Sequence, residues 1–103
     1  MGIIRVVLEG EHGNLVQELA SNSHALDAIL PEAEDKNYEC LRFIDPYGDT
    51  VFNNLQMGQV IAEFQKLAAS VDDAEAREVI AEVIRLADMG RRQPHLYLRF
   101  YGD

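Results

Sequence analysis

The sequence predicts an α+β fold, in which an antiparallel sheet of about four strands carries an antiparallel pair of helices on one face. Two observations predict the helix pair: apolar stripes with helical spacing cover residues 55–69 and 72–89, and only a few residues separate them. A third observation predicts the sheet, because apolar runs of strand character lie at both ends of the chain. A length of 103 residues is typical of one domain, so we expect 1–103 to fold as a single domain.

Residues 3–8 are rich in β-branched side chains and predict a strand near the centre of the sheet. Glycines in the next segment, 10–14, predict a turn. Leu15, Val16 and Leu19 then either continue as a short helix or return as the second arm of a hairpin, and the glycine-rich connection favours the hairpin. Residues 95–101 alternate most regularly and predict the last strand, with these apolar side chains on one face: Leu96, Leu98 and Phe100.

The middle of the chain predicts a short helix and a further strand. Asn22 or Ser23 is a suitable N-cap for the helix, and Pro31 ends it. The apolar positions of this helix are Leu26, Ile29 and Leu30. A polar, mostly acidic loop over 32–37 follows, and residues 38–44 then predict a strand whose alternate side chains lie on opposite faces.

The segment after this strand combines a turn with the start of a helix. Asp45-Pro46-Tyr47-Gly48 has the residues that a β-turn favours, because the aspartate bonds the backbone ahead and the proline presets φ. Asn53 and Gln56 have the spacing of a capping box, and Phe52 and Met57 have that of a hydrophobic staple. We therefore expect a well-defined helix start just after residue 53.

Two amphipathic helices follow. The first has an apolar stripe of Met57, Val60, Ile61, Phe64, Leu67 and Ala68. Asp72 is expected to open the second helix, with Glu75 at the capping-box position. Its stripe is Ala76, Val79, Ile80, Val83, Ile84 and Ala87. Gly90 is expected to end this helix as its C′ residue, and Pro94 prevents continuation.

Charge is the most distinctive global property of the chain, whose formal net charge is −9. Residues 9–49 contain ten acidic side chains against only Lys36 and Arg42, whereas the rest of the chain is close to neutral. A region of one sign repels nucleic acid and attracts basic partners. The alternative is that the charge only keeps a small protein soluble, and the sequence leaves both interpretations open.

The sequence contains no motif that announces a reaction. Its three histidines are far apart and its only cysteine, Cys40, has no base beside it, so we expect no metal, no cofactor and no nucleophilic catalysis. Cys40 lies in an apolar-rich run and is expected to be a buried thiol, as in a reducing cytoplasm. No signal pattern and no apolar run of about 20 residues is present, so we expect a cytoplasmic protein without membrane contact.

The block from Leu41 to Met57 reads Leu-Arg-Phe-Ile-Asp-Pro-Tyr-Gly-Asp-Thr-Val-Phe-Asn and continues to Leu-Gln-Met. It resembles a block carried by a set of small, mostly uncharacterised bacterial proteins. The Met-Gly-Ile start, the Leu30-Pro31 pair and the ending over 95–103 are similar too, so the resemblance spans most of the chain. It implies no activity and no catalytic residue. In size, charge and fold class the chain also resembles immunity proteins of contact-dependent or secreted toxin systems.

We therefore expect a non-enzymatic binding protein whose acidic surface engages a basic protein, for example an immunity protein that blocks a basic toxin such as a nuclease. The expected contact residues are Asp45, Tyr47 and Asp49 first, and then Glu32, Glu34 and Asp35. Two alternatives remain open. One is a small enzyme that uses Asp45, Asp49 and His95, and the other is a homo-oligomeric structural protein that associates through Tyr97, Arg99 and Tyr101.

Overall fold

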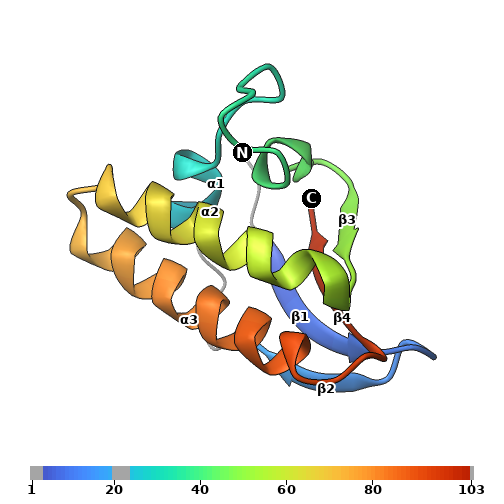
Figure 1. Cartoon of the computed structure of the whole chain (residues 1–103). Helices are drawn as coiled ribbons and strands as arrows, with labels where there is room; N and C mark the ends of the chain where they lie inside the picture. Colours follow the sequence, from blue (N-terminus) through green and yellow to red (C-terminus); the bar gives the residue numbers. More distant parts are fainter. Residues whose placement is uncertain (1–3, 20–23, 103) are drawn as a thin grey trace.

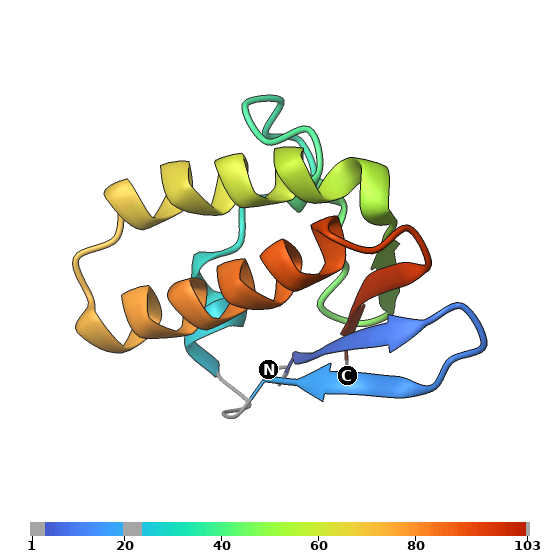
Figure 2. The ribbon, with the colours of Figure 1, turned by 60° about the horizontal axis from the view of Figure 1, so that its bottom comes forward.

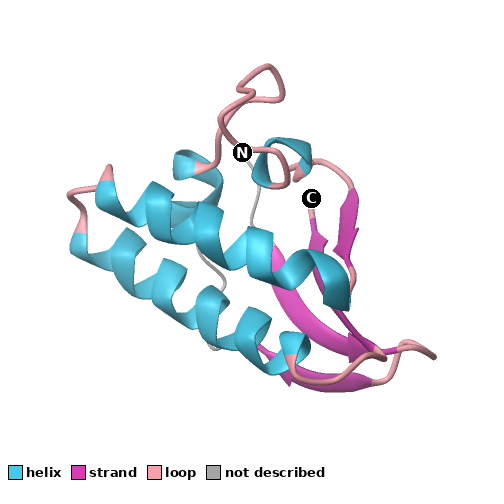
Figure 3. Ribbon diagram, viewed as in Figure 1, coloured by secondary structure: helices cyan, strands magenta, loops and turns pink. Residues whose placement is uncertain are grey.

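A computed structural model describes residues 4–19 and 24–102, and Figure 1 shows how their elements are arranged. The strands are β1 (Arg5–Gly10), β2 (Leu15–Glu18), β3 (Asp49–Phe52) and β4 (Leu96–Tyr101). The α-helices are α1 (His24–Ile29), α2 (Met57–Ala69) and α3 (Ala74–Arg91), and the two short 3-10 helices are η1 (Leu41–Phe43) and η2 (Asn54–Gln56). The long helices α2 and α3 lie side by side and run in opposite directions (Figure 3).

The four strands form one antiparallel sheet in the order β2-β1-β4-β3. β1 is therefore an internal strand, as its apolar sequence predicts, and β2 and β3 are the two edges. Figure 2 shows the helices on one face of this sheet, while no described helix covers the opposite face. The predicted α+β fold, with an antiparallel helix pair on an antiparallel sheet, is confirmed.

The core lies between the helix pair and the inner face of the sheet. β4 alternates between buried and half-buried side chains, and the three apolar residues predicted to share a face are all buried. Phe100 lies on this face, opposite Val6 of β1. Its ring stacks on Phe64 of α2 at a centroid distance of 6.3 Å and meets Phe52 of β3 edge-to-face at 5.9 Å. One aromatic side chain thus joins both layers of the fold.

The glycine-rich segment connects β1 and β2 as a hairpin, as predicted. The Gly10 amide donates to the Asn14 carbonyl at 2.9 Å, and the Gly13 amide donates to the Gly10 carbonyl at 3.0 Å. Gly13 has φ +81°, a left-handed conformation that favours glycine. The predicted caps of the next helix, Asn22 and Ser23, lie outside the described residues. α1 itself includes the predicted positions Leu26 and Ile29 and ends just before the third, Leu30.

The predicted capping box is confirmed at the start of η2, which leads directly into α2. The Asn53 side chain accepts hydrogen bonds from the amides of Leu55 and Gln56, and the Gln56 side chain accepts one from the Asn53 amide at 2.9 Å. Phe52 and Met57, the two staple residues, are both buried in the core. The local signals therefore place the beginning of this helical segment correctly.

The predicted strand over 38–44 is wrong. This segment contains η1 instead, and the third strand of the sheet is β3, which lies later in the chain. Both edges of β4 are already occupied, by β1 and by β3, so no edge of β4 is left for residues 38–44. In η1 the residues three apart face the same way. Leu41 and Ile44 are accordingly buried, while Phe43 is 58% exposed.

Both ends of α3 differ from the prediction. Asp73, not Asp72, is the N-cap, and its carboxylate accepts a hydrogen bond from the Ala76 amide at 2.9 Å. The helix also continues through Gly90, which is buried where a Cβ would come within 3.0 Å of Leu8 and Met57 side-chain atoms. This glycine permits close packing of α3 on the sheet and on α2, instead of ending the helix.

The aromatic junction of the core gives a test of the fold. We expect Phe52→Ala to lower the free energy of unfolding by about 3–5 kcal/mol, because the ring is buried and packs against Phe100. Leu55→Ala is the matched control: this side chain is 90% exposed, so its removal should change stability by no more than about 0.5 kcal/mol. Chemical denaturation measures both variants, and equal stabilities would contradict the packing described.

Candidate functional site

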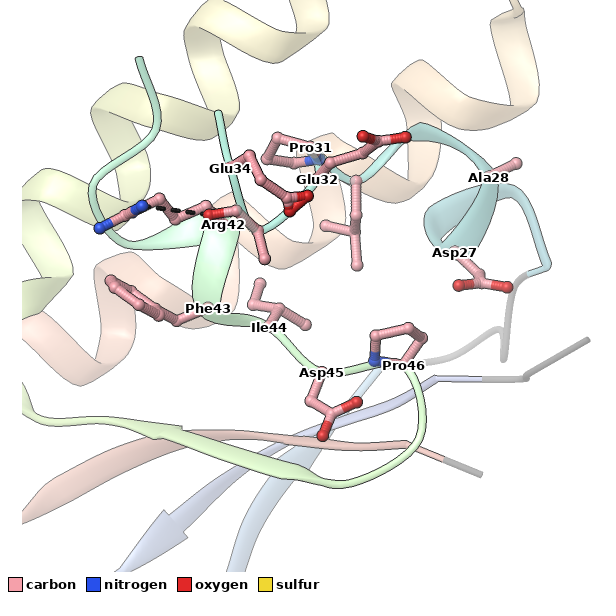
Figure 4. Close-up of a pocket in the computed structure, with 12 residues that line it drawn as sticks. Asp27, Ala28, Pro31, Glu32, Glu34, Arg42, Phe43, Ile44, Asp45 and Pro46 are labelled. Atoms are coloured by element: carbon pink, nitrogen blue, oxygen red, sulfur yellow. Dashed lines mark hydrogen bonds between the residues drawn. The ribbon is translucent and has the colours of Figure 1, made fainter. Parts of the chain in front are cut away.

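A groove of about 770 Å³ lies between the end of α1 with the loop after it and the segment from η1 to the following turn. Residues 27–34 supply one wall and residues 42–46 supply the other. Figure 4 shows these two walls facing each other across the opening. In Figure 1 the loop after α1 projects away from the body of the molecule, so the groove lies beside the most protruding part of the chain.

The groove is strongly acidic. Its carboxylates are those of Asp27, Glu32, Glu34 and Asp45, and its only basic side chain is Arg42. The Arg42 guanidinium donates a hydrogen bond to the Ala33 carbonyl at 3.0 Å and lies 4.4 Å from the centre of the Phe43 ring. Arg42 therefore joins the two walls and forms no ion pair with any carboxylate of the groove within the described residues.

Two exposed aromatic rings lie at this end of the molecule. Phe43 lines the groove and is 58% exposed, and Tyr47, on the adjacent turn, is 72% exposed. Aromatic side chains are enriched where proteins bind one another. The groove thus combines a negative lining with rigid apolar groups at its edge.

The turn at 45–48 is stabilised by a hydrogen bond within it and by a hydrogen bond from the end of the chain. The Asp45 carboxylate accepts a hydrogen bond from the Tyr47 amide at 2.8 Å, which is the turn interaction that the sequence predicts. The Gly102 amide donates to the Gly48 carbonyl at 2.6 Å, and a Cβ on Gly102 would come within 2.6 Å of backbone atoms of this turn. The end of the chain after β4 therefore fixes the position from which Tyr47 projects.

The structure brings together only some of the six predicted contact residues. Glu32, Glu34 and Asp45 line the groove, whereas Asp35, Tyr47 and Asp49 lie outside its lining. Asp35 accepts a hydrogen bond from the Asn37 amide at 3.0 Å and so shapes the loop. Sequence reasoning missed Asp27, which reaches the groove from α1; its spacing from Leu30 and Pro31 is the signal that could have placed it beside the acidic loop.

A buried carboxylate supports the second wall, and sequence reasoning missed it too. Glu63 of α2 is 3% exposed, and its oxygens accept hydrogen bonds from the Cys40 amide at 3.0 and 3.1 Å and from the Leu41 amide at 2.9 Å. The Gln59 side chain donates a further one at 2.7 Å. The signal in the sequence is an acidic residue within the apolar stripe of α2, a position that requires hydrogen-bond donors.

Cys40 is half-buried rather than fully buried. It packs against the core cluster, and burial, together with the charges of Glu63 and Glu39, raises the pKa of its thiol. A raised pKa reduces the thiolate fraction at neutral pH, which makes this cysteine a weak nucleophile.

The acidic residues of the hairpin and those of segment 27–49 differ in their partners. Those of the hairpin have partners: Glu18 accepts from Arg5 Nε at 2.8 Å, and Glu9 accepts from the Tyr101 hydroxyl at 2.7 Å. Segment 27–49 contains seven acidic and two basic side chains. None of the seven carboxylates forms an ion pair with a described residue. Segment 27–49 therefore carries a formal net charge of −5, and four of its carboxylates line the groove.

The groups of the alternative enzyme do not meet. Asp49 lies opposite Tyr101 at one end of β4, whereas His95 precedes Leu96 at the other end. The strand between them spans roughly 20 Å at ~3.3 Å per residue. His95 instead lies 3.1 Å from a carboxylate oxygen of Glu11 in the hairpin. Asp45, Asp49 and His95 therefore share no site.

The side chains proposed for self-association lie on the sheet face that no described helix covers. β4 is an internal strand, so Tyr97, Arg99 and Tyr101 lie on a face and not at an edge. Tyr101 is engaged by Glu9, and this hydrogen bond raises the pKa of its hydroxyl. Arg99 Nε lies 3.3 Å from Glu9, in a geometry that does not form a hydrogen bond. Tyr101 and Arg99 therefore interact with Glu9 and with each other within the sheet.

Among residues 4–19 and 24–102, no three histidine, cysteine or carboxylate side chains are grouped as metal ligands. No helix within those residues has the length and apolar character needed to cross a membrane. Comparisons with protein-family models, curated proteins and solved structures found no match to this chain.

Removing the Glu63 carboxylate should loosen the wall of the groove. We expect Glu63→Ala to lower the free energy of unfolding by about 2–4 kcal/mol, because the buried amide of Leu41 and the partly buried amide of Cys40 lose their acceptor. The amides of Cys40 and Leu41 should also exchange faster with solvent. Glu78→Ala, at an exposed position of α3, is the control and should stay within about 0.5 kcal/mol of the parent. Unchanged exchange at both amides would contradict the role of Glu63.

The ion pair at the sheet surface should make stability depend on pH. The hydrogen bond and charge of Arg5 hold the pKa of Glu18 below its ordinary value. The stabilisation is therefore present above the ordinary carboxyl range and disappears as the pH falls through the lowered pKa. We expect Glu18→Gln to lower the melting temperature at neutral pH, with the difference from the parent closing in an acid series. A difference that persists in strong acid would contradict this assignment.

Proposed function

We propose that this protein is a non-enzymatic binding protein that holds a basic segment of a partner protein in its acidic groove. One observation carries the proposal: four carboxylates line a groove whose single guanidinium is bonded to a backbone carbonyl. Lysine and arginine side chains of a partner would meet several unneutralised carboxylates at once, in a recess that reduces their exposure to water. Such an arrangement accelerates encounter and favours the correct partner.

The aromatic side chains at the edge of the groove would supply the apolar part of the contact. Phe43 and Tyr47 are exposed, and the latter projects from a turn that hydrogen bonds hold in place. A rigid aromatic ring loses little conformational freedom on binding, so it suits an anchor position at an interface. Charge would thus guide the partner, and the rings would slow its dissociation.

The most specific form of the proposal is an immunity protein that neutralises a basic toxin such as a nuclease, in the cytoplasm of the cell that makes both. The acidic groove would then imitate the charge of the nucleic acid that the toxin binds. Genes that neighbour the coding sequence should encode the toxin. A tagged form of the chain should capture a protein rich in lysine and arginine at low salt and release it at high salt.

The groove carboxylates can be tested directly on the captured partner. We expect the triple variant Asp27→Asn, Glu32→Gln and Glu34→Gln to weaken binding about tenfold or more, since each exposed charge pair contributes about 0.5–1 kcal/mol. Titration calorimetry of the purified partner with each variant measures this change.

A second triple variant provides the matched control. Asp72→Asn, Glu78→Gln and Glu82→Gln remove the same charge from positions that do not line the groove, so they should weaken binding much less. Equal losses from both triples would mean that net charge alone acts, and the groove would be excluded. The proposal fails altogether if no basic protein is captured at low salt and no neighbouring gene encodes a toxin.

A further inference from the structure

A second groove, of about 680 Å³, lies between the outer sides of α2 and α3 and shares no lining residue with the acidic groove. Its lining residues lie within 58–65 of α2 and within 84–91 of α3, and Arg92, just after α3, completes the lining. Each stretch is about two helical turns long, at 1.5 Å per residue. The groove therefore follows the line of contact between the two long helices that face the viewer in Figure 1.

The floor of this groove is apolar and holds few bulky side chains. Ile61 and Ile84 are half-buried at its base, and Met89 is 41% exposed at its side. Gly58 and Ala62, one turn apart on α2, add almost no side-chain volume. A Cβ placed on Gly58 would meet no atom within 4 Å, so no contact inside the described fold requires a glycine here. Glycine within a helix costs about 0.5–1 kcal/mol relative to alanine, and what it provides at this position is open space.

The rim of the groove is positive on a chain that is otherwise strongly negative. The lining contains one carboxylate, that of Asp88, and three guanidinium groups, those of Arg85, Arg91 and Arg92. Asp88 accepts hydrogen bonds from Arg91 at 2.6 Å and from Arg92 at 2.7 Å. Partial desolvation opposes ionisation of Asp88, but these two guanidiniums outweigh it and hold its pKa below the ordinary value.

Two guanidiniums around one carboxylate leave an excess positive charge. Arg85 adds another, because it forms no ion pair within residues 4–19 and 24–102. The groove therefore presents an apolar floor between guanidinium groups that are available to carboxylates of another molecule.

We propose that this groove binds an acidic amphipathic helix of a partner protein. A helix laid along the groove would place apolar side chains at i, i+3 or i+4, and i+7 on Ile61, Ile84 and Met89. Glutamate or aspartate residues flanking that stripe would reach the guanidiniums at the rim. Gly58 and Ala62 would let the backbone of the incoming helix approach α2 closely, which larger side chains would prevent.

The charges also argue against two other occupants. If a second copy of this chain bound here about a two-fold axis through the groove, the guanidinium groups of the two copies would face each other and repel. Nucleic acid would meet only this small positive rim on a molecule with a net charge of −9, and it would be repelled by the remainder. A partner of opposite charge and helical shape fits both features of the groove.

The experiment uses the full chain and a labelled synthetic peptide of about 15 residues, or four helical turns. The peptide carries leucines with helical spacing and glutamates on either side, and a matched peptide carries glutamines in place of the glutamates. Fluorescence anisotropy at low salt should show that the glutamate peptide binds about tenfold or more tightly than the glutamine peptide. The double variant Arg85→Gln and Arg92→Gln should remove most of that difference.

Gly58→Leu is the decisive variant, because the leucine side chain would fill the groove. Leucine also has a higher helix propensity than glycine, so the variant should not destabilise α2. We expect it to weaken binding of the glutamate peptide about tenfold or more without lowering the melting temperature. Ala81→Leu is the control: it enlarges an exposed position of α3 that does not line this groove, and binding should persist. The triple variant of the acidic groove should bind the peptide as the parent does.

Three results would each overturn the proposal. The first is equal affinity for the two peptides, or no binding of either. The second is unchanged binding by Gly58→Leu. The third is light scattering that shows the parent to be a dimer and Gly58→Leu to be a monomer, because the groove would then be an interface between copies of this chain.

Discussion

The buried carboxylate of Glu63 is the interaction on which the acidic groove depends. A charge inside a protein without a counter-ion is costly unless donors surround it, and here two backbone amides and the Gln59 side chain do so. Because these amides belong to Cys40 and Leu41, α2 holds the start of η1 against the core. Leu41 and Ile44 then point inward, and Arg42 and Phe43 are left to form the wall of the groove. A residue more than 20 positions away thus shapes the candidate site.

The distribution of charge, rather than its total, separates the surfaces of this molecule. On the open face of the sheet, Glu18 is paired with Arg5 at 2.8 Å and Glu9 lies 3.3 Å from Arg99, so guanidiniums balance these two carboxylates. Around the acidic groove the carboxylates are unneutralised, and between α2 and α3 the excess is positive. Two grooves of opposite sign, built from different elements, suit partners of opposite chemistry.

Local rules account for much of the fold. The alternation of 96–101, the glycines of the hairpin, and the Asn53–Gln56 capping box depend on neighbours in sequence, and all three appear as predicted. The segment 38–44 was misassigned because alternating apolar residues are compatible with a strand and with a short 3-10 helix that buries positions three apart. Gly90 was misassigned for a similar reason, since a glycine near a helix end also serves where another element packs closely.

The sequence alone was sufficient for the α+β class, the two amphipathic helices, the turn at Asp45 and the excess of carboxylates in one region, because each of these follows from spacing and composition. It was not sufficient for the site. Asp27 and Asp45 line the same acidic groove, and Gly58 and Arg92 line the same positive groove. Such neighbours arise only when helices and loops pack, and the packing depends on contacts, such as those of Glu63, that no local pattern contains.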